Sequence, residues 1–311
     1  MAYDSLFALY AQRDWESILS QWATAPSQSE IEKCERAVRM VREAIRGDTE
    51  LDALNPEVFA QGSYANRTNT PQDSDVDICV RLNGTFWYQL PAGITPAQYG
   101  FRDATISYEG FKSLVERALK AKFGSQSVNR GDKAITVRAS TARVSADVVA
   151  TLEHRRYGLN GPQDYERGAE LRSDSGKQII NWPEQNYSNG IKKNDETDRR
   201  FKAVVRILKN LRAEMEESGI SSASKIPSYL VECLIWNVPN ERLLGDSSRL
   251  DLRRSIVFLY TAVSDKASCN EWGEVNERKY LFRDSQPWKR EDVVQFLHDA
   301  WNYTGFRRDE T

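Results

Sequence analysis

Two aspartates separated by one residue, Asp75 and Asp77, are the side chains of this 311-residue chain best placed to do chemistry. They begin a segment in which every second residue from Val76 to Leu82 is apolar, a pattern typical of a strand with one buried face. Because residues i and i+2 of a strand project to the same side, the two carboxylates face one point. Hard divalent cations prefer oxygen ligands, so we expect Mg²⁺ there, or Mn²⁺ in its place.

A third carboxylate, Asp147, is the one acid of the otherwise apolar stretch 144–149. An unpaired charge in such a strand would cost several kcal/mol, and a bound cation would remove that cost. Two metal ions held roughly 3.5–4 Å apart can stabilise both the attacking and the leaving oxygen of a phosphoryl transfer. We therefore predict that Asp75, Asp77 and Asp147 are the catalytic and metal-binding residues. The alternative interpretation of Asp75 and Asp77 is that they lie at the solvated end of a strand.

The pair Gly62-Ser63 precedes the acids by a polar spacer. A glycine lets the backbone approach a ligand closely, and a serine that opens a helix offers its hydroxyl and free N–H groups to a phosphate. A Gly-Ser pair is also a common helix N-cap, and either motif alone would be weak evidence. Their order along the chain favours a nucleotide-binding site.

Together, Gly62-Ser63, the spacer, Asp75-x-Asp77 and a later strand acid resemble the DNA polymerase β-like nucleotidyltransferases. The amino-acid sequence of residues 61–70 and 73–78 is similar to that of the cGAS/DncV-like branch, the bacterial CD-NTases. That resemblance implies an α+β fold with two lobes. We expect a nucleotidyltransferase lobe with a small mixed sheet in residues 1–195 and an all-helical, nucleotide-binding lobe in residues 196–311.

In that branch, a lysine on a helix of the second lobe holds the donor triphosphate, and a Ser-Tyr pair opens a later helix. Lys209 and Ser228-Tyr229 match this arrangement. By resemblance, Lys209 and Ser228 touch phosphate and Tyr229 stacks on the donor base. In this arrangement Lys209 lies at the edge of the apolar stripe of its helix, with its stem along packed surface. The simpler alternatives are a solvated helix lysine and an N-cap serine beside a core tyrosine. Lys202 is expected to be a solvated charge.

The resemblance also implies the activity. Two Mg²⁺ ions and ATP, GTP or other nucleoside triphosphates would give a cyclic di- or trinucleotide second messenger, which activates a separate effector protein in CBASS antiphage defence. Arg67, Trp182 and Tyr187 are candidates for the acceptor pocket, although each also suits a surface or packing role. The bases, the linkage and the ring size are left open.

Two other functions fit the same fold: an RNA-directed terminal nucleotidyltransferase of the tRNA or poly(A) type, and a non-catalytic nucleotide-binding module. The chain has 43 Lys and Arg against 45 Asp and Glu and a pI near 5.9. This balance disfavours strong nucleic-acid binding. The presence of all three acids disfavours the non-catalytic module.

The remaining sequence supplies the elements that must position these residues. We expect a helix in the first 22 residues carrying Leu6, Tyr10, Ile18 and Trp22, and a longer one capped by Ser29 and ended by Gly47. A strand at residues 57–60, a loop at 83–104, a helix ended by Gly124 and strands at 134–139 and 143–150 follow. Residues 154–193 read as an irregular hinge, and everything beyond them is helical in pattern.

Composition limits the setting. No apolar run approaches the roughly 20 residues of a membrane span, and the N-terminus lacks the basic start of a signal peptide. The four cysteines lie 35 or more residues apart and share no metal-ligand spacing with the two histidines. We expect free thiols, no membrane association and a cytoplasmic protein.

Overall fold

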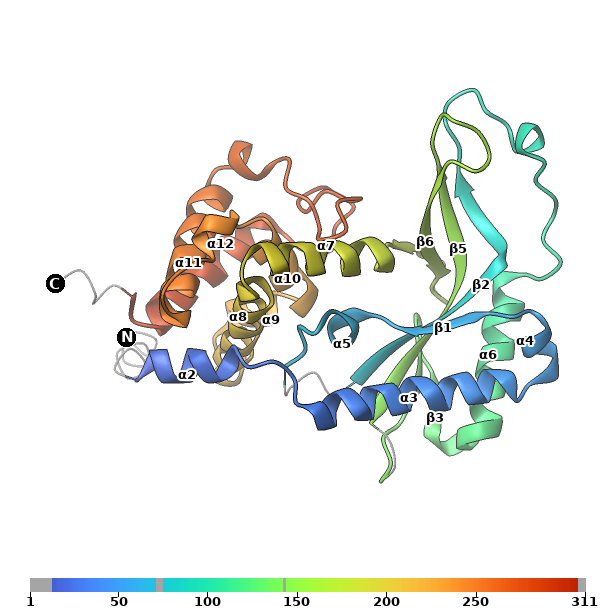
Figure 1. Cartoon of the computed structure of the whole chain (residues 1–311), viewed down its shortest axis with the longest axis horizontal. Helices are drawn as coiled ribbons and strands as arrows, with labels where there is room; N and C mark the ends of the chain where they lie inside the picture. The colour runs from blue at the N-terminus through green and yellow to red at the C-terminus, as the bar shows by residue number, and fades with distance from the viewer. Residues whose placement is uncertain (1–12, 71–74, 142–143, 307–311) are drawn as a thin grey trace. The chain divides into compact units, whose positions relative to one another are not determined.

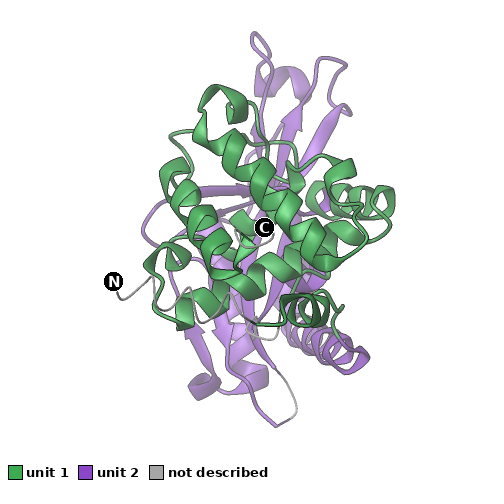
Figure 2. Cartoon of the chain, turned by 90° about the vertical axis from the view of Figure 1, so that its left-hand side faces the viewer, with its two compact units in different colours: residues 1–26, 66–72, 185–311 green, residues 27–65, 73–184 purple. Residues whose placement is uncertain are grey.

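The structure is a computed structural model that describes residues 13–70, 75–141 and 144–306. It divides into two compact units (Figures 1 and 2). Residues 13–26, 66–70 and 185–306 form the helical unit, and the other described residues form the sheet unit. Each unit is assembled from separate stretches of the chain, whereas the expected division was a single cut after residue 195.

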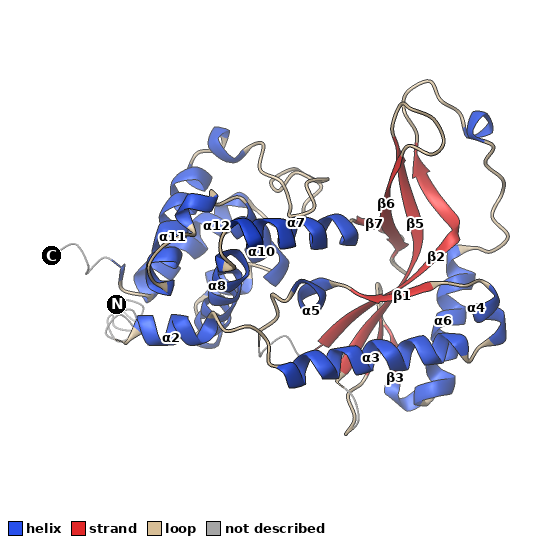
Figure 3. Ribbon diagram, viewed as in Figure 1, coloured by secondary structure: helices blue, strands red, loops and turns tan. Residues whose placement is uncertain are grey.

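The sheet unit is built on one mixed seven-stranded sheet (Figure 3). Its strands are β1 (Glu57–Ala60), β2 (Asp75–Gln89), β3 (Val128–Arg130), β4 (Ile135–Val137), β5 (Ser145–Tyr157), β6 (Tyr165–Arg172) and β7 (Gln178–Asn181). The order is β1-β2-β5-β4-β3, and β6 pairs with both β5 and β7. The β2–β5 pair is parallel and every other pair is antiparallel. The α+β class with a small mixed sheet is confirmed.

One face of the central strands is apolar, as the alternation in β2 predicted. Val76, Ile78 and Val80 are fully buried and share a core cluster with residues of α3 (Gln28–Arg46) and α6 (Tyr108–Phe123). Burial of each such side chain stabilises the fold by about 1.5–3 kcal/mol. Because strand residues alternate, the aspartates of β2 belong to the opposite face.

Short elements complete this unit: α4 (Thr49–Ala53), α5 (Gly62–Asn66) and the 3₁₀ turns η1 (Pro96–Tyr99) and η2 (Ser125–Ser127). Gly124 ends α6 as expected. The N-cap of α3 is Ser27, not Ser29, because the side chain of Ser27 accepts from the amide of Glu30 in a capping box.

Two expectations for this unit were wrong. The loop expected at 83–104 starts later, because β2 continues to Gln89 through an irregularity between Leu82 and Phe86 that accommodates the Asn-Gly pair. The stretch 154–193, expected to be irregular, is ordered, since β5 runs to Tyr157 and is followed by β6, β7 and α7 (Pro183–Glu196). Charged residues inside these strands interrupt the alternation of polar and apolar residues by which a strand is predicted. The boundary between the two units, after Glu184, does fall within this stretch, as expected.

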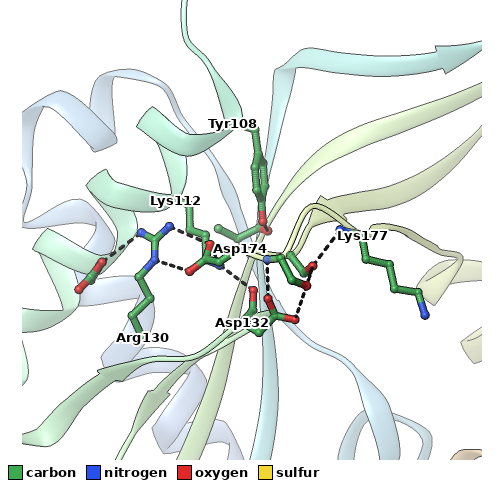
Figure 4. A network of polar contacts seen from close by, with 10 residues as sticks. Tyr108, Lys112, Arg130, Asp132, Asp174 and Lys177 are labelled. Atoms are coloured by element: carbon green, nitrogen blue, oxygen red, sulfur yellow. Dashed lines mark hydrogen bonds and ion pairs between the residues drawn. The ribbon is translucent and has the colours of Figure 1, made fainter.

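A charged network fastens the helix α6 to the turns at one end of the sheet (Figure 4). Lys112 is almost fully buried, and its ammonium donates to the Asp174 carboxylate at 2.8 Å and to the carbonyl of Asp132 at 3.1 Å. Arg130 donates to both oxygens of Asp174. These bonds hold the pKa of Asp174 well below its usual range and tie together the turns that flank β4 and β7.

The helical unit contains α2 (Trp15–Trp22), α7, α8 (Arg200–Glu217), α9 (Ser221–Ser224), α10 (Ser228–Trp236), α11 (Ser248–Ser264) and α12 (Arg290–Tyr303), with the 3₁₀ turns η3 (Asn240–Arg242) and η4 (Ala267–Cys269). Ile18 and Trp22 lie on α2 and pack against the hydrophobic core of the helical unit. Leu6 and Tyr10 lie outside the described residues. Twelve of the eighteen residues of α8 are buried, so this helix is the centre of the unit. Across both units, the four cysteines are free and buried, as expected.

Candidate functional site

The parallel register of β2 and β5 brings the three candidate acids together. Asp77 lies directly opposite Asp147, and Asp75 lies opposite Ser145. Residues opposite each other in a sheet project to the same face, so all three carboxylates share the face that α3 and α6 do not cover. Asp75 is exposed, and Asp77 and Asp147 are partly buried.

Gly62 stands against the carboxylate of Asp77. The amide of Gln61 donates to the carbonyl of Asp77 at 2.9 Å, which fixes the end of β1 beside β2. Gly62 has a φ of +67°, and a Cβ at this position would lie 2.1 Å from Oδ2 of Asp77. A residue with a Cβ would be strained by this positive φ and would displace the Asp77 carboxylate. Ser63 lies in the first turn of α5 and is partly buried.

Asp147 is oriented by a neighbour on β4. The hydroxyl of Thr136, directly opposite in the antiparallel β4–β5 pair, donates to Oδ1 of Asp147 at 2.7 Å. This bond fixes the orientation of the Asp147 carboxylate.

The donors fit a hard divalent cation, because all three are carboxylates on one face. Within the described residues, no three His, Cys, Asp or Glu side chains come close enough together to enclose a metal ion. Cys34 is close enough for Asp77 to influence it, but burial above all raises the pKa of its thiol to about 11, which keeps it protonated.

Lys209, on α8 in the helical unit, is 3% exposed, and its ammonium donates to the carbonyl of Thr68 at 3.0 Å. The alternative that Lys209 is a solvated helix lysine was wrong. So was the expectation that Lys202 is solvated, because Lys202 is 8% exposed and burial lowers the pKa of its ammonium. Both errors arise because α8 is surrounded by other segments of its unit.

Ser228 is the first residue of α10, and the N-cap position belongs to Pro227. The N-cap alternative for Ser228 is therefore wrong. Tyr229 follows it and is 37% exposed, so it is not simply a core tyrosine.

The hydroxyl end of Tyr229 is enclosed by polar side chains that the sequence did not reveal. Its single proton is shared between Oε2 of Glu274 at 2.9 Å and, at the longer distance of 3.3 Å, Oδ1 of Asn186, while Asn276 donates to the hydroxyl oxygen at 3.1 Å. Burial and the nearby carboxylates raise the pKa of Tyr229 well above its usual range. The hydroxyl is anchored while part of the ring stays accessible.

The acceptor-pocket candidates differ in exposure. Trp182 is buried, with its ring edge-on to His154 at 5.6 Å and under the guanidinium of Arg156 at 4.6 Å, so it has a packing role. Tyr187 is 48% exposed. Arg67 is exposed and has a φ of 55°.

Comparison with known proteins places this arrangement in a family. A model of the cGAS/DncV-like nucleotidyltransferase C-terminal helical domain matches residues 188–305, and a nucleotidyltransferase domain model matches residues 41–127. The cyclic dipyrimidine nucleotide synthase CdnE of Legionella pneumophila is 44% identical over 292 residues, covering 93% of this chain and 98% of that protein. The chain belongs to the CD-NTase family.

Other relatives agree with this assignment. A cyclic dipyrimidine nucleotide synthase CdnE of Cecembia lonarensis is 42% identical, covering 94% of this chain and 98% of that protein. The structure of Rhodothermus marinus CdnE c-UMP-AMP synthase with Apcpp and Upnpp is 31% identical, with a TM-score of 0.82, and the match covers 94% of this chain and 97% of that one.

This CD-NTase is therefore a nucleotidyltransferase, an enzyme that synthesises a cyclic oligonucleotide. Membership of this family implies that it uses a divalent metal ion. In the described part of the chain, no helix has the length and apolar character needed to span a bilayer.

Proposed function

We propose that this CD-NTase joins nucleoside triphosphates into a cyclic di- or trinucleotide at the face formed by Asp75, Asp77 and Asp147. The observation that carries the proposal is the parallel register, which sets Asp77 opposite Asp147 with Asp75 on the same face. Gly62, whose backbone abuts Asp77, brings the Gly-Ser turn beside the same carboxylates.

Each residue has a distinct role in this proposal. The three acids hold two Mg²⁺ ions, which when bound neutralise phosphate charge and favour the deprotonated form of the attacking hydroxyl. Ser63 binds phosphate in the sheet unit. In the helical unit, Lys209 and Ser228 bind the triphosphate, and Tyr229 stacks on the donor base.

Asp147 also accepts the proton in the chemical step. The bond from Thr136 orients the Asp147 carboxylate, which takes the proton from a ribose hydroxyl of the acceptor nucleotide. That hydroxyl oxygen forms a bond to the α-phosphorus of the donor, and the bond to pyrophosphate breaks. A second such step within the linear intermediate closes the ring.

We further propose that at least one of the bases is a pyrimidine. The relatives at 44% and 42% identity are cyclic dipyrimidine synthases, whereas a relative from Elizabethkingia meningoseptica at 33% is a cyclic dipurine synthase. The Rhodothermus marinus relative, at 32%, is a cyclic UMP-AMP synthase. The product would act on a separate effector protein in antiphage defence, and the enzyme itself would work in the cytoplasm.

Product analysis tests this proposal. The purified chain is incubated with Mg²⁺ and α-labelled ATP, GTP, CTP and UTP, singly and in pairs, with and without RNA. We expect a phosphatase-resistant product that needs UTP or CTP and no RNA. A product made only from purines would overturn the base assignment. Label added to RNA ends would favour the terminal nucleotidyltransferase, and no product from any mixture would favour the non-catalytic module.

A further inference from the structure

The helix α8 carries three buried cations on one face. Lys202, Arg206 and Lys209 follow one another at steps of four and three residues, which places them on the same side of a helix. Their exposed fractions are 8%, 7% and 3%. Buried cations normally require partners, because loss of water disfavours the charged form.

Two of the three have such partners. Arg206 donates to the carbonyl of Ala23 at 3.1 Å and to that of Arg67 at 2.8 Å. Lys209 donates to the carbonyl of Thr68. The ammonium of Lys202 has neither a hydrogen bond nor an ion pair with any residue that the structure describes.

The charges around Lys202 do not balance it. Glu232 on α10 and Asp195 on α7 attract its ammonium, while Arg67 and Arg206 repel it. Glu232 is 3% exposed, and its oxygens already accept from three neutral groups: Asn66 at 3.3 Å, Thr68 at 2.8 Å and Asn186 at 3.2 Å. Among the described residues, the three cations Lys202, Arg67 and Arg206 outnumber the two acids.

We propose that Lys202 binds the polyphosphate tail of the nucleotide and extends the phosphate site of Lys209 along α8. This inference rests on the proposed role of Lys209 in nucleotide binding. The two lysines are seven residues apart, or about 10 Å along the helix axis. A ligand that reaches both needs several spaced anionic groups, and a triphosphate has them. Its charge supplies the partner that the ammonium of Lys202 lacks.

Binding of tripolyphosphate alone, without metal or base, tests this inference by calorimetry on the full chain. Lys202→Met removes the charge and keeps the apolar stem. We expect its dissociation constant for tripolyphosphate to rise about tenfold or more, since charge-assisted bonds of this kind are among the strong ones. Its melting temperature should rise, because a buried cation without a bonded partner is lost.

Lys192→Ala is the matched control, because the Lys192 side chain is 75% exposed and its nearest acid oxygen is 4.0 Å away. This variant should change neither the dissociation constant for tripolyphosphate nor the melting temperature. Lys202→Arg, which keeps the charge, should retain most of the affinity.

An unchanged dissociation constant in Lys202→Met would overturn the inference. Unfolding of both Lys202→Met and Lys202→Gln would overturn it as well, because Lys202 would then support the fold. Product formation by the wild type is measured separately, so a chain that binds tripolyphosphate through Lys202 and makes no product would contradict the proposed function alone.

Discussion

The sheet unit and the helical unit hold their candidate residues by different physical means. In the sheet unit, backbone register alone sets Asp77 opposite Asp147, and the acids stay partly or fully accessible. In the helical unit, Lys209 is buried and Tyr229 is anchored by its hydroxyl, so side-chain bonds fix them. The comparison indicates that changes to the acids should affect chemistry with little effect on folding, whereas changes on α8 and α10 should affect both.

The acids provide the sharpest test of this contrast. Asp75→Asn together with Asp77→Asn should lower product formation at least about a thousandfold, because metal clamps contribute several kcal/mol to such reactions. The melting temperature should stay the same or rise, since repulsion between like charges is relieved. Rate and thermal unfolding are measured on the same preparation. Activity above a thousandth of the wild-type value would contradict the two-metal assignment.

Lys209 should show the mixed behaviour expected of the helical unit. Lys209→Ala should raise KM for the triphosphate, lower kcat by about tenfold or more, and lower the melting temperature, because the bond to the Thr68 carbonyl is lost. Lys209→Arg should fall between the alanine variant and the wild type. Lys192→Ala, at an exposed lysine, should match the wild type in steady-state kinetics. If Lys209→Ala also matches the wild type, Lys209 does not bind the triphosphate.

Gly62 tests whether the turn positions the Asp77 carboxylate. Gly62→Ala forces a Cβ into Oδ2 of Asp77 and adds about 1–2 kcal/mol of left-handed backbone strain. Gly93→Ala is the control, because Gly93 also has a positive φ but has open space around it. Both variants should lose similar stability from strain, and only Gly62→Ala should lose most of its activity. Equal activities would show that the close approach is irrelevant to catalysis.

At Tyr229 the kinetic effect should be confined to substrate binding. Tyr229→Ala should raise KM by the equivalent of about 1–3 kcal/mol through lost stacking on the base. Tyr229→Phe should restore most of the KM but lower the melting temperature, because buried Glu274 loses a donor. KM and the melting temperature, measured for the wild type and both variants, separate the contribution of the ring to binding from the contribution of the hydroxyl to stability. If Phe is as damaging to KM as Ala, the hydroxyl rather than the ring makes the contact.

Sequence reasoning was most successful where local periodicity carries the information. Alternation from Val76 to Leu82 predicted the apolar face of β2, and with it the shared face of Asp75 and Asp77. The pairing of Asp77 with Asp147 depends on contacts seventy residues apart, which no local pattern contains. From the sequence we could predict only that Asp147 lies on a strand next to that of Asp77.

The strands after residue 150 were missed for a physical reason. Their interior residues include Glu153, His154 and Glu170, each of which is buried but paired with another polar or charged side chain. Such pairs remove the polar and apolar alternation by which a strand is identified. In the same way, Lys202 was expected to be solvated because an apolar stripe shows only one face of a helix, whereas α8 is packed on nearly all of its faces.

Metal binding is the most direct test of the central claim, that the β2–β5 register creates a two-metal site. Mn²⁺ bound per chain is counted by electron paramagnetic resonance in the presence of a non-hydrolysable triphosphate, for the wild type and for Asp77→Asn. We predict two Mn²⁺ ions in the wild type and at most one in Asp77→Asn, with the fold of the variant intact. Two ions bound with unchanged affinity in Asp77→Asn would contradict it.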